Sequence, residues 1–326
     1  MKQVKWGIIG VGDVCEVKSA PAMNLIEHSE IAAVMRRDGD KAADYARRHG
    51  ISKWYDNADK LINDPNVNAI YIATPPASHK EYTVRSAKAG KPVYVEKPMA
   101  KSYAECQEMI AACEKADVSL HVAYYRRALP YFLKIKELVD SGKIGKVRMV
   151  EVRMIKPSDP DIKTDLQSHW RVNPVISGGG YFYDLASHQL DFLDFLLGPI
   201  KKASGYSQNQ AGLYEAEDIV AASFEFESGV LGTGSWCFTS GNTSDKEVTT
   251  IIGSRGQISY GTFGDNFVRL ETDQGGEEIF EFVMPKHIQQ PLIELVVGDL
   301  LGKNSSPSTG VSGARTNRVM EWCQGK

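Results

Sequence analysis

Residues 94–100 (YVEKPMA) place an acid and a base side by side directly after a short apolar run. Residues 93–95 are typical of a buried strand, and Glu96, Lys97 and Pro98 follow it. One interpretation is structural: Lys97 marks a solvated strand end, and Pro98 stops the strand. The other is chemical, because ligands of parallel α/β sheets bind at the carboxyl ends of the strands. Taken alone these residues favour the structural interpretation, so the rest of the chain has to decide.

A second group of reactive residues lies in residues 177–198 (SGGGYFYDLASHQLDFLDFLLG). Asp184 and His188 are four residues apart on an apolar helix, so they share one face. Histidine titrates near neutral pH, and a neighbouring carboxylate can orient or tune it. A single histidine on such a helix is usually a core or capping residue. The preceding Asp, together with three glycines that permit close approach to a ligand, makes a catalytic pair the better interpretation. Asp191 and Asp194 are either supporting partners or surface charges.

A glycine-rich turn near the N-terminus is the third candidate. Gly10-x-Gly12-x-x-Cys15 follows an apolar run and opens a helix, which is the setting that dinucleotide binding requires. The first glycine makes a tight turn, and the second lets the backbone approach a pyrophosphate at the helix N-terminus. Asp13 and Val14 begin that helix and are included in the predicted site. Cys15 is small enough for the third position. The alternative is an ordinary glycine-rich turn.

The kind of dinucleotide is decided where the second strand ends. An NAD site places a carboxylate there for the ribose 2′-hydroxyl, whereas an NADP site places an arginine against the 2′-phosphate. Here the apolar run 31–35 leads into Arg36 and Arg37, and Asp38 comes only after them. The two arginines favour NADP as the cofactor, with NAD as the alternative if they only form a solvated loop.

The elements that must position these residues alternate between strand and helix over the first part of the chain. Capping-box patterns at Ser78 and Ser102 predict two helix starts, and Gly90 predicts a helix end. The predicted strands cover 4–9, 31–35, 69–73, 92–95 and 119–123, and a further helix covers 40–49. This order is typical of α/β proteins with a doubly wound parallel sheet, a Rossmann domain over residues 1–123.

The pattern changes after residue 124. Helices are expected at about 130–141, 180–197, 287–302 and 312–323, and strands at 147–155 and as successive segments between 201 and 283. Short strands separated by glycine-containing turns are typical of an open, mostly antiparallel sheet. The sequence therefore predicts a second α+β domain over residues 124–326, for substrate binding and oligomerisation.

Composition excludes several classes of protein. The 326 residues carry a net charge of −3 and 24% charged residues, which argues against a nucleic-acid surface or a polybasic membrane patch. No apolar run approaches the ~20 residues of a membrane helix, and the N-terminus does not resemble a signal peptide. The five cysteines are an odd number and show no metal-ligand spacing, so free thiols in a reducing cytoplasm are expected and no metal site.

Taken together, these motifs resemble the Gfo/Idh/MocA oxidoreductases, the family of glucose-fructose oxidoreductase and inositol dehydrogenase. The resemblance rests on the glycine turn, EKP at a later strand end, and GGG-x-x-x-D-x-x-x-H on a helix. It covers essentially the whole chain. It extends to a further set of residues: Thr74, Pro75, Pro76, His79, Tyr124, Tyr125, Arg126, Arg127, Trp170, Arg171, Ser308, Thr309, Gly310, Arg315 and Thr316.

The resemblance reverses the interpretation of Lys97. It implies that Glu96 lies beside the cofactor, that Lys97 faces both nicotinamide and substrate, and that Pro98 takes part in unusual backbone geometry. It also implies that Asp184 and His188 are the family's catalytic Asp and His. The remaining implied cofactor contacts are Thr74, Pro75, Pro76, His79 and Arg127, and the implied substrate contacts are Tyr124, Trp170 and Arg171. The arginines after the second strand depart from the NAD sites common in the family.

The expected activity is hydride transfer between NADP or NAD and a secondary alcohol of a sugar, polyol or related cyclic diol. His188 would take the hydroxyl proton, Lys97 would hold the reacting oxygen, and Asp184 would orient His188 or bind a neighbouring hydroxyl. Two alternatives remain, a dinucleotide-binding regulator without turnover and an NAD-dependent glycosidase of the same family. Loops such as 156–176 are expected to set substrate specificity.

A homodimer or homotetramer is expected through the β-rich domain. Val220, Ala222, Phe224 and Phe226 share one strand face, and Leu231 and Trp236 lie on the neighbouring run. A monomer would leave such a patch in water, unless the C-terminal helices cover both faces of the sheet.

Overall fold

The computed structural model describes residues 1–159, 169–264 and 266–326, in two compact units. The first unit contains residues 1–128 and 285–314, and the second contains residues 129–284 and 315–326. The sequence-based division differs from this, because it assigned everything after residue 123 to the second domain. The physical reason is helix α10 (Gln290–Leu300), whose apolar side chains join a core of the first unit.

The first unit is built on a six-stranded parallel sheet with the strand order β3-β2-β1-β4-β5-β6. Its strands are β1 (Val4–Ile9), β2 (Ser29–Met35), β3 (Trp54–Tyr55), β4 (Ala69–Ile72), β5 (Val93–Val95) and β6 (Leu120–Val122). This order is that of a Rossmann sheet, in which ligands bind at the carboxyl ends where the strand order reverses, here between β1 and β4. The predicted doubly wound sheet is confirmed.

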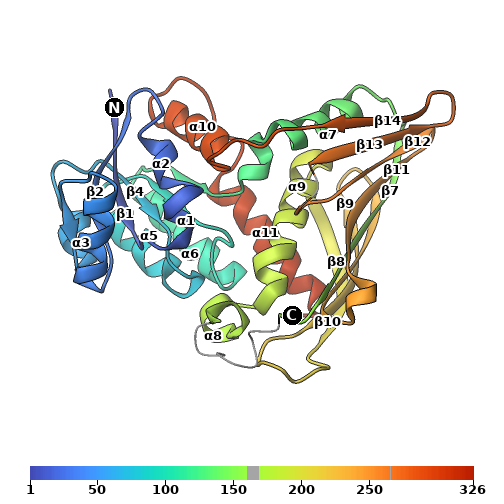
Figure 1. The fold of residues 1–326 in the computed structure, drawn as a ribbon, viewed down its shortest axis with the longest axis horizontal. Coiled ribbons are helices and arrows are strands. Elements are labelled where there is room, and N and C mark those ends of the chain that lie inside the picture. The colour runs from blue at the N-terminus through green and yellow to red at the C-terminus, as the bar shows by residue number, and fades with distance from the viewer. Residues whose placement is uncertain (160–168, 265) are drawn as a thin grey trace. The chain divides into compact units, whose positions relative to one another are not determined.

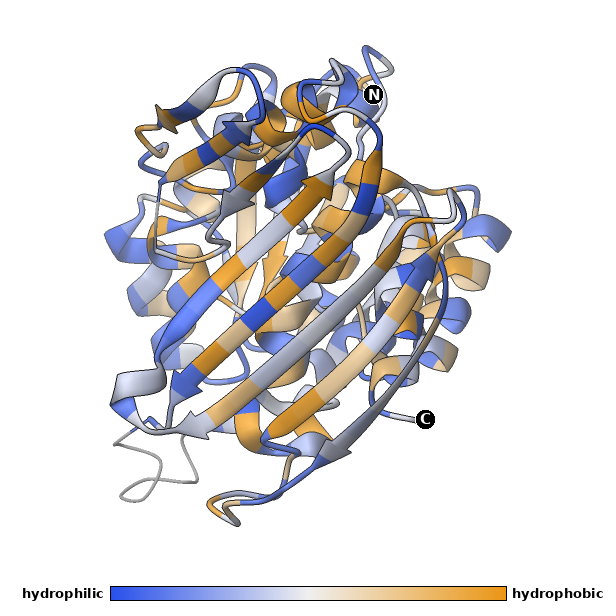
Figure 2. Cartoon of the chain, turned by 90° about the vertical axis from the view of Figure 1, so that its right-hand side faces the viewer, coloured by the Kyte–Doolittle hydropathy of each residue, from blue (hydrophilic) through white to orange (hydrophobic). Residues whose placement is uncertain are grey.

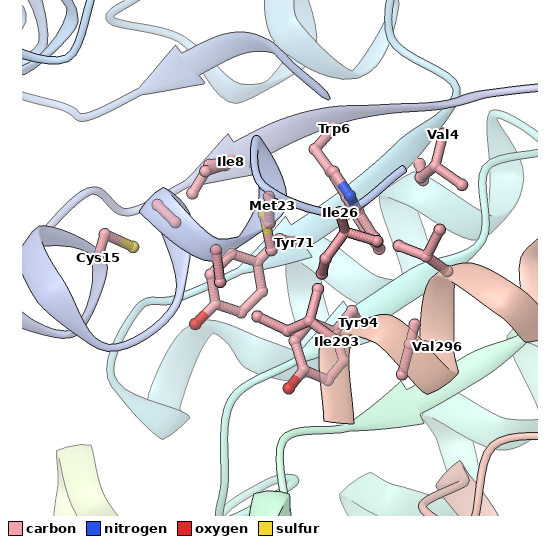
Figure 3. Packing of buried hydrophobic residues seen from close by; sticks show 14 of the residues in the cluster. Val4, Trp6, Ile8, Cys15, Met23, Ile26, Tyr71, Tyr94, Ile293 and Val296 are labelled. Carbon is pink, nitrogen blue, oxygen red and sulfur yellow. The ribbon is translucent and has the colours of Figure 1, made fainter. Parts of the chain in front are cut away.

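Helices cover both faces of this sheet and bury a core on each. They are α1 (Asp13–Val17), α2 (Ala20–Met23), α3 (Gly39–Arg48), α4 (Ala58–Ile62), α5 (His79–Lys88), α6 (Tyr103–Lys115) and α10, and α11 (Gly310–Cys323) starts in this unit. Figure 3 shows one core, in which Trp6, Tyr71 and Tyr94 lie with Ile293 and Val296 of α10. The other core includes side chains of α4 and α6.

The second unit carries an eight-stranded sheet with the order β14-β13-β12-β11-β7-β10-β9-β8 (Figure 1). Its strands are β7 (Val147–Pro157), β8 (Ile200–Gln208), β9 (Ile219–Phe226), β10 (Leu231–Ser240), β11 (Lys246–Gly253), β12 (Gly256–Tyr260), β13 (Phe267–Thr272) and β14 (Gly276–Glu281). All neighbouring pairs are antiparallel except β7 with β10. The predicted mostly antiparallel open sheet is confirmed.

One face of this sheet is packed under α7 (Pro130–Asp140) and α9 (Ser187–Leu197), with α8 (Pro174–Ser177) nearby in sequence. Phe132 of α7 and Phe192 of α9 contact each other and Tyr260 of β12 through ring edges. Val220, Phe224, Phe226 and Trp236 are all buried on this covered face. The expectation that this patch would need a partner chain is therefore wrong, because helices of the same chain already cover it.

The opposite face of the sheet, which is turned toward the viewer in Figure 2, carries exposed residues that are both polar and apolar. Leu231, on β10, belongs to this face and is 57% exposed. It pairs across the strands with Met149 of β7, which pairs in turn with Ile252 of β11. These three residues form an apolar row, and the next two residues of β7 on this face, Glu151 and Arg153, are charged and exposed.

The two predicted capping boxes have different outcomes. Ser102 caps α6, since its hydroxyl accepts a hydrogen bond from the backbone N–H of Glu105. Ser78 precedes α5 but does not cap it, because the 3₁₀ turn Pro76–Ser78 already gives it helical backbone angles. Its hydroxyl donates to Thr74 and to the Pro75 carbonyl instead.

No helix in the described parts of the chain is both long and apolar enough to cross a membrane.

Candidate functional site

The glycine loop between β1 and α1 is shaped for close approach to a ligand. Gly10 has a φ of +93°, and a Cβ there would lie 2.5 Å from the Thr74 side chain, so only glycine fits. Gly12 is extended and borders open space, with nothing within 4 Å of a Cβ position. Because the first N–H groups of a helix lack partners within it, the start of α1 fits a pyrophosphate. Asp13 is exposed and Val14 half-buried beside Gly12.

Cys15 acts as a packing residue at the third position of the glycine motif. It is fully buried in the core beneath the loop. Burial raises the pKa of its thiol to about 12, so the thiol remains protonated and unreactive at neutral pH. The departure from a third glycine therefore leaves the loop intact.

Of the two arginines that follow β2, one contacts the glycine loop. Arg36 is half-buried and donates from Nη1 to the carbonyl oxygen of Val11 at 3.1 Å, whereas Arg37 is exposed. Asp38 is the N-cap of α3: its carboxylate accepts a hydrogen bond from the Lys41 backbone and pairs with the Lys41 side chain. The nearest carboxylate after the strand is thus already engaged as a cap.

His79 connects two of the loops at the carboxyl edge of the sheet. Its Nε2 lies 2.6 Å from the carbonyl oxygen of Thr74, and its Nδ1 lies 3.1 Å and 3.2 Å from those of Pro98 and Met99. The ring is completely buried, and burial lowers its pKa. Both ring nitrogens therefore face the protein's own backbone, so His79 supports the cofactor loops instead of presenting a polar atom to a ligand. Thr74 and Pro75 remain half-buried at the loop surface and Pro76 is buried.

Glu96 and Lys97 follow β5, the second neighbour of β1 along the sheet. Glu96 is only 7% exposed, and its Oε1 accepts hydrogen bonds from Tyr71 (2.6 Å) and Gln289 (2.7 Å). Lys97 is half-buried, and the peptide bond between it and Pro98 is cis. The carboxyl edge of the sheet therefore brings together the glycine loop, the loop after β4 that contains Thr74, and the Glu96–Lys97 pair.

Tyr124 and Arg127 follow β6 and are both buried. Arg127 donates from Nη1 to the carbonyl oxygen of Pro307 at 3.0 Å. This contact ties the residues that follow β6 to the segment 285–314 of the same unit.

In the second unit, two of the three consecutive glycines allow close contacts within the chain. A Cβ on Gly179 would lie 2.3 Å from the ring of Tyr183, and Gly180 has a φ of +65° with Ala216 2.6 Å from its Cβ position. The expected approach to a ligand is thus replaced, at these two glycines, by approach to protein atoms. The next turn, Phe182–Ala186, is a π-helical turn, a feature that is frequent at functional sites.

Asp184 lies in this π-helical turn, and His188 lies one turn later in α9. Asp184 accepts a hydrogen bond from Nε of Arg171 at 3.1 Å, and the Arg171 guanidinium stacks on Trp170. Arg171 itself is half exposed, at 50% of its side chain. His188 is 3% exposed and meets the ring edge of Phe263. The structure thus brings Trp170, Arg171 and Asp184 into contact with one another. Residues 160–168 of the predicted specificity loop lie outside the described residues.

Gln189, the residue after His188, belongs to a buried hydrogen-bond network that was not predicted from the sequence. Glu247 accepts hydrogen bonds from the backbone N–H groups of Thr262 and Phe263 and from the amide of Gln189. Gln189 accepts in turn from the indole of Trp236. Burial raises the pKa of Glu247. The only local sequence signal for Glu247 is the alternation of side chains along β11, which turns Glu247 toward the face of the sheet that the helices cover.

Asp191 and Asp194 are buried partners of α11. Asp194 binds Arg315 through two hydrogen bonds of 2.8 Å and 2.6 Å, and Asp191 accepts from Thr316 at 3.3 Å. The interpretation of these residues as surface charges is therefore wrong.

Among the described residues, no group of three or more His, Cys, Asp and Glu side chains could hold a metal ion.

Comparisons with known proteins agree with this geometry. A family model described as "Oxidoreductase family, NAD-binding Rossmann fold" matches residues 4–124, and one described as "GFO/IDH/MocA C-terminal domain" matches residues 132–259. An oxidoreductase of Formosa agariphila is 39% identical over 98% of this chain and 98% of its own length.

Two further proteins with described activities are similar over most of the chain. A myo-inositol 2-dehydrogenase of Thermotoga maritima is 27% identical over 89% of this chain and 85% of its own. A crystal structure of an aldose-aldose oxidoreductase from Caulobacter crescentus, complexed with glycerol, superposes with a TM-score of 0.84 at 26% identity, over 98% and 96% of the two chains. The family models and the first relative together show that this chain belongs to the Gfo/Idh/MocA family of oxidoreductases, with an NAD-binding Rossmann domain.

Proposed function

We propose that the protein is an NAD(P)-dependent dehydrogenase or reductase that acts on a secondary alcohol or carbonyl of a sugar, polyol or related cyclic diol. The observation that carries the proposal is the Glu96–Lys97 pair at the carboxyl edge of the Rossmann sheet, where a buried carboxylate precedes a half-buried amine. The substrate class is supported by two relatives, a myo-inositol dehydrogenase and an aldose-aldose oxidoreductase.

The first unit's residues have distinct roles in this proposal. The backbone at Gly10 and Gly12 and the start of α1 hold the pyrophosphate, and Glu96 lies beside the nicotinamide. When bound, that ring supplies a hydride acceptor or donor. Lys97 donates a hydrogen bond to the reacting oxygen and stabilises negative charge that develops on it.

The second unit supplies the proposed base. His188 takes the hydroxyl proton during oxidation and returns it during reduction, because an imidazole titrates near neutral pH. Asp184 and Arg171 bind neighbouring hydroxyls, since their ion pair presents both acceptor and donor atoms. Trp170 supports the Arg171 guanidinium by stacking on it.

For the cofactor we propose NADP, with NAD as the alternative. Two observations support this choice. Arg36 and Arg37 directly follow β2, and the Asp38 carboxylate is engaged at the start of α3. An NAD site needs a carboxylate at the end of this strand for the ribose hydroxyls.

A screen of sugars and polyols with NAD and NADP, followed by the absorbance of the reduced nicotinamide, tests the proposal. We expect turnover with at least one cyclic polyol or aldose and a lower KM for NADP. Binding of dinucleotide without turnover on any of them would favour a regulatory protein. Cleavage of a glycoside without net reduction of free cofactor would favour the NAD-dependent glycosidase instead.

A further inference from the structure

A buried hydrogen-bond network holds the carboxylate of Glu96 from a distant part of the chain. Glu96 Oε1 accepts from the hydroxyl of Tyr71 at 2.6 Å and from Nε2 of Gln289 at 2.7 Å. The hydroxyl of Tyr94 donates to Oε1 of Gln289 at 3.2 Å. Gln289 is 1% exposed, and the two tyrosines are fully buried with their rings stacked (Figure 3). Both ends of the Gln289 amide are thus engaged.

The direction of these hydrogen bonds follows from the chemistry of the groups. An ionised carboxylate only accepts, so the amide nitrogen of Gln289 has to face Glu96 and its oxygen has to face Tyr94. Burial, followed by the charge of Glu96, raises the pKa of both Tyr71 and Tyr94. Both hydroxyls therefore stay protonated and donate. A carboxylate this deeply buried needs such donors, because an uncompensated buried charge is strongly unfavourable.

The backbone of Gln289 is held in place, which limits how far its amide can follow a movement of the Glu96 carboxylate. Its N–H donates to the carbonyl of Lys18 at 3.1 Å, and its carbonyl accepts from Ile293 at 3.0 Å in the first turn of α10. On the other side of the carboxylate, Glu96 Oε2 accepts from the backbone N–H of Lys97 at 3.3 Å. The orientation of the carboxylate is thereby linked to the Lys97 main chain.

We propose that Gln289 is a positioning residue of the cofactor site. It fixes the Glu96 carboxylate and, through it, the main chain at Lys97. The inference rests on the proposed function for the identity of the ligand, a nicotinamide dinucleotide. It means that the Rossmann unit is completed by a residue that the chain supplies only after all the strands of the second unit.

Gln289→Glu is the sharpest test because it keeps the shape of the side chain. It puts a second carboxyl within hydrogen-bond distance of Glu96, and two carboxyls this close share a proton with a raised apparent pKa. At low pH the introduced carboxyl donates to Glu96 and replaces the amide. As the pH rises it ionises and repels Glu96. We expect the Kd for NADPH and NADH to increase about tenfold or more with rising pH in this variant.

Gln289→Leu removes both hydrogen bonds at nearly constant volume. It should weaken dinucleotide binding about tenfold or more at every pH, because the lost bond is to a charged group. The matched controls are the same two changes at Gln290, the next residue, which is half-buried in the first turn of α10. Binding is measured by the fluorescence of the reduced dinucleotide, with thermal unfolding in parallel.

The outcomes separate this inference from the proposed function. If the unmodified chain binds neither NADPH nor NADH, the proposed function fails and the inference with it. If it binds them but the Gln289 variants match the Gln290 variants in Kd and pH profile, only the inference is overturned, even if the melting temperature falls. Should Gln289→Leu fail to fold, Tyr94→Phe provides a second measurement, since it removes the donor to Gln289 and should also raise the Kd.

Discussion

Adjacent residues at the end of β5 have opposite surroundings. Glu96 is held inside the first unit by Tyr71 and Gln289, whereas Lys97 is only half-buried. A strand reverses side-chain direction at each residue, so the chain can bury one charge and present the next. The sequence pattern identified the pair, but not the donors that stabilise Glu96, because Gln289 is far away in the sequence.

Lys97→Ala tests the proposed role of the amine. We expect it to retain dinucleotide affinity and to lower kcat by about a hundredfold or more, the usual effect of removing a group that stabilises developing charge. Lys101→Ala is the matched control, since Lys101 lies on the same loop and interacts with Glu105. Near-normal turnover of Lys97→Ala on the true substrate would remove Lys97 from the mechanism.

His79 should make folding stability depend on pH in mildly acidic solution. Burial lowers its pKa from 6.5 in the folded chain. As the pH falls below 6.5 the unfolded chain takes up a proton that the folded chain does not, so the free energy of unfolding decreases. His79→Asn should reduce this slope by up to about 1.4 kcal/mol per pH unit.

The measurement for His79 is denaturant unfolding between about pH 5 and pH 8. His28→Asn is the control at a histidine whose side chain is 45% exposed. Burial also lowers the pKa of His121, so part of the slope should survive in the variant. An unchanged slope would contradict the assignment to His79.

At the scale of elements, hydrophobic periodicity predicted the strands well and local capping signals less well. The apolar runs of β1, β4 and β5 are buried throughout or nearly so, which leaves a clear pattern. Ser78 and Ser102 carry the same capping-box pattern, yet only Ser102 caps. The difference comes from Pro75 and Pro76, which favour a tight turn before α5 and change the backbone of Ser78.

The alternation of polar and apolar residues could not tell what covers the apolar face of the second sheet. β9 places Val220, Phe224 and Phe226 on one side, and that pattern is the same whether helices or a second chain cover it. In the structure, helices α7 and α9 of the same chain cover this side. The π-helical turn at Asp184 was equally hidden, because the apolar pattern does not distinguish it from the α-helix that follows.

The turn that follows β2 should set the cofactor preference. Replacing both Arg36 and Arg37 with Ala should weaken NADP binding about tenfold to a hundredfold and NAD binding far less, since only NADP carries the 2′-phosphate. Arg36 also contacts the Val11 carbonyl, so Arg37→Ala alone separates phosphate binding from support of the loop.

Arg47→Ala is a suitable control for these variants, because Arg47 is a 76% exposed arginine on the neighbouring helix α3. Dissociation constants for both dinucleotides are the measurement. An equal loss for NADP and NAD, or a preference of the unmodified chain for NAD, would overturn the assignment.

At the scale of the whole molecule, the chain enters the first unit twice. Residues 285–314 return after the second sheet, and α11 then runs from the first unit into the second. The Gln289–Glu96 and Arg127–Pro307 contacts both depend on this return. A linear division of the sequence misses it, because composition and periodicity do not report which core a late helix joins.

We expect a homo-oligomer, most simply a dimer, through the exposed face of the eight-stranded sheet (Figure 2). The physical reason is the apolar row of Ile252, Met149 and Leu231 that crosses three neighbouring strands there. Leu231 alone is 57% exposed. Soluble chains seldom leave contiguous apolar surface in water. A sheet face that carries this row beside the exposed charges of Glu151 and Arg153 can match its own copy across a two-fold axis.

Light scattering at micromolar concentration tests this prediction. The unmodified chain should scatter as a particle of at least twice its 36.0 kDa. The double variant Met149→Glu and Leu231→Glu should scatter as a single chain, because two copies of the face would then repel each other and leave charges without partners. Leu25→Glu is the control, since Leu25 is 64% exposed on the first unit. A stable single-chain particle for the unmodified protein would contradict the prediction, and an oligomer that survives the double variant would move the interface away from this row.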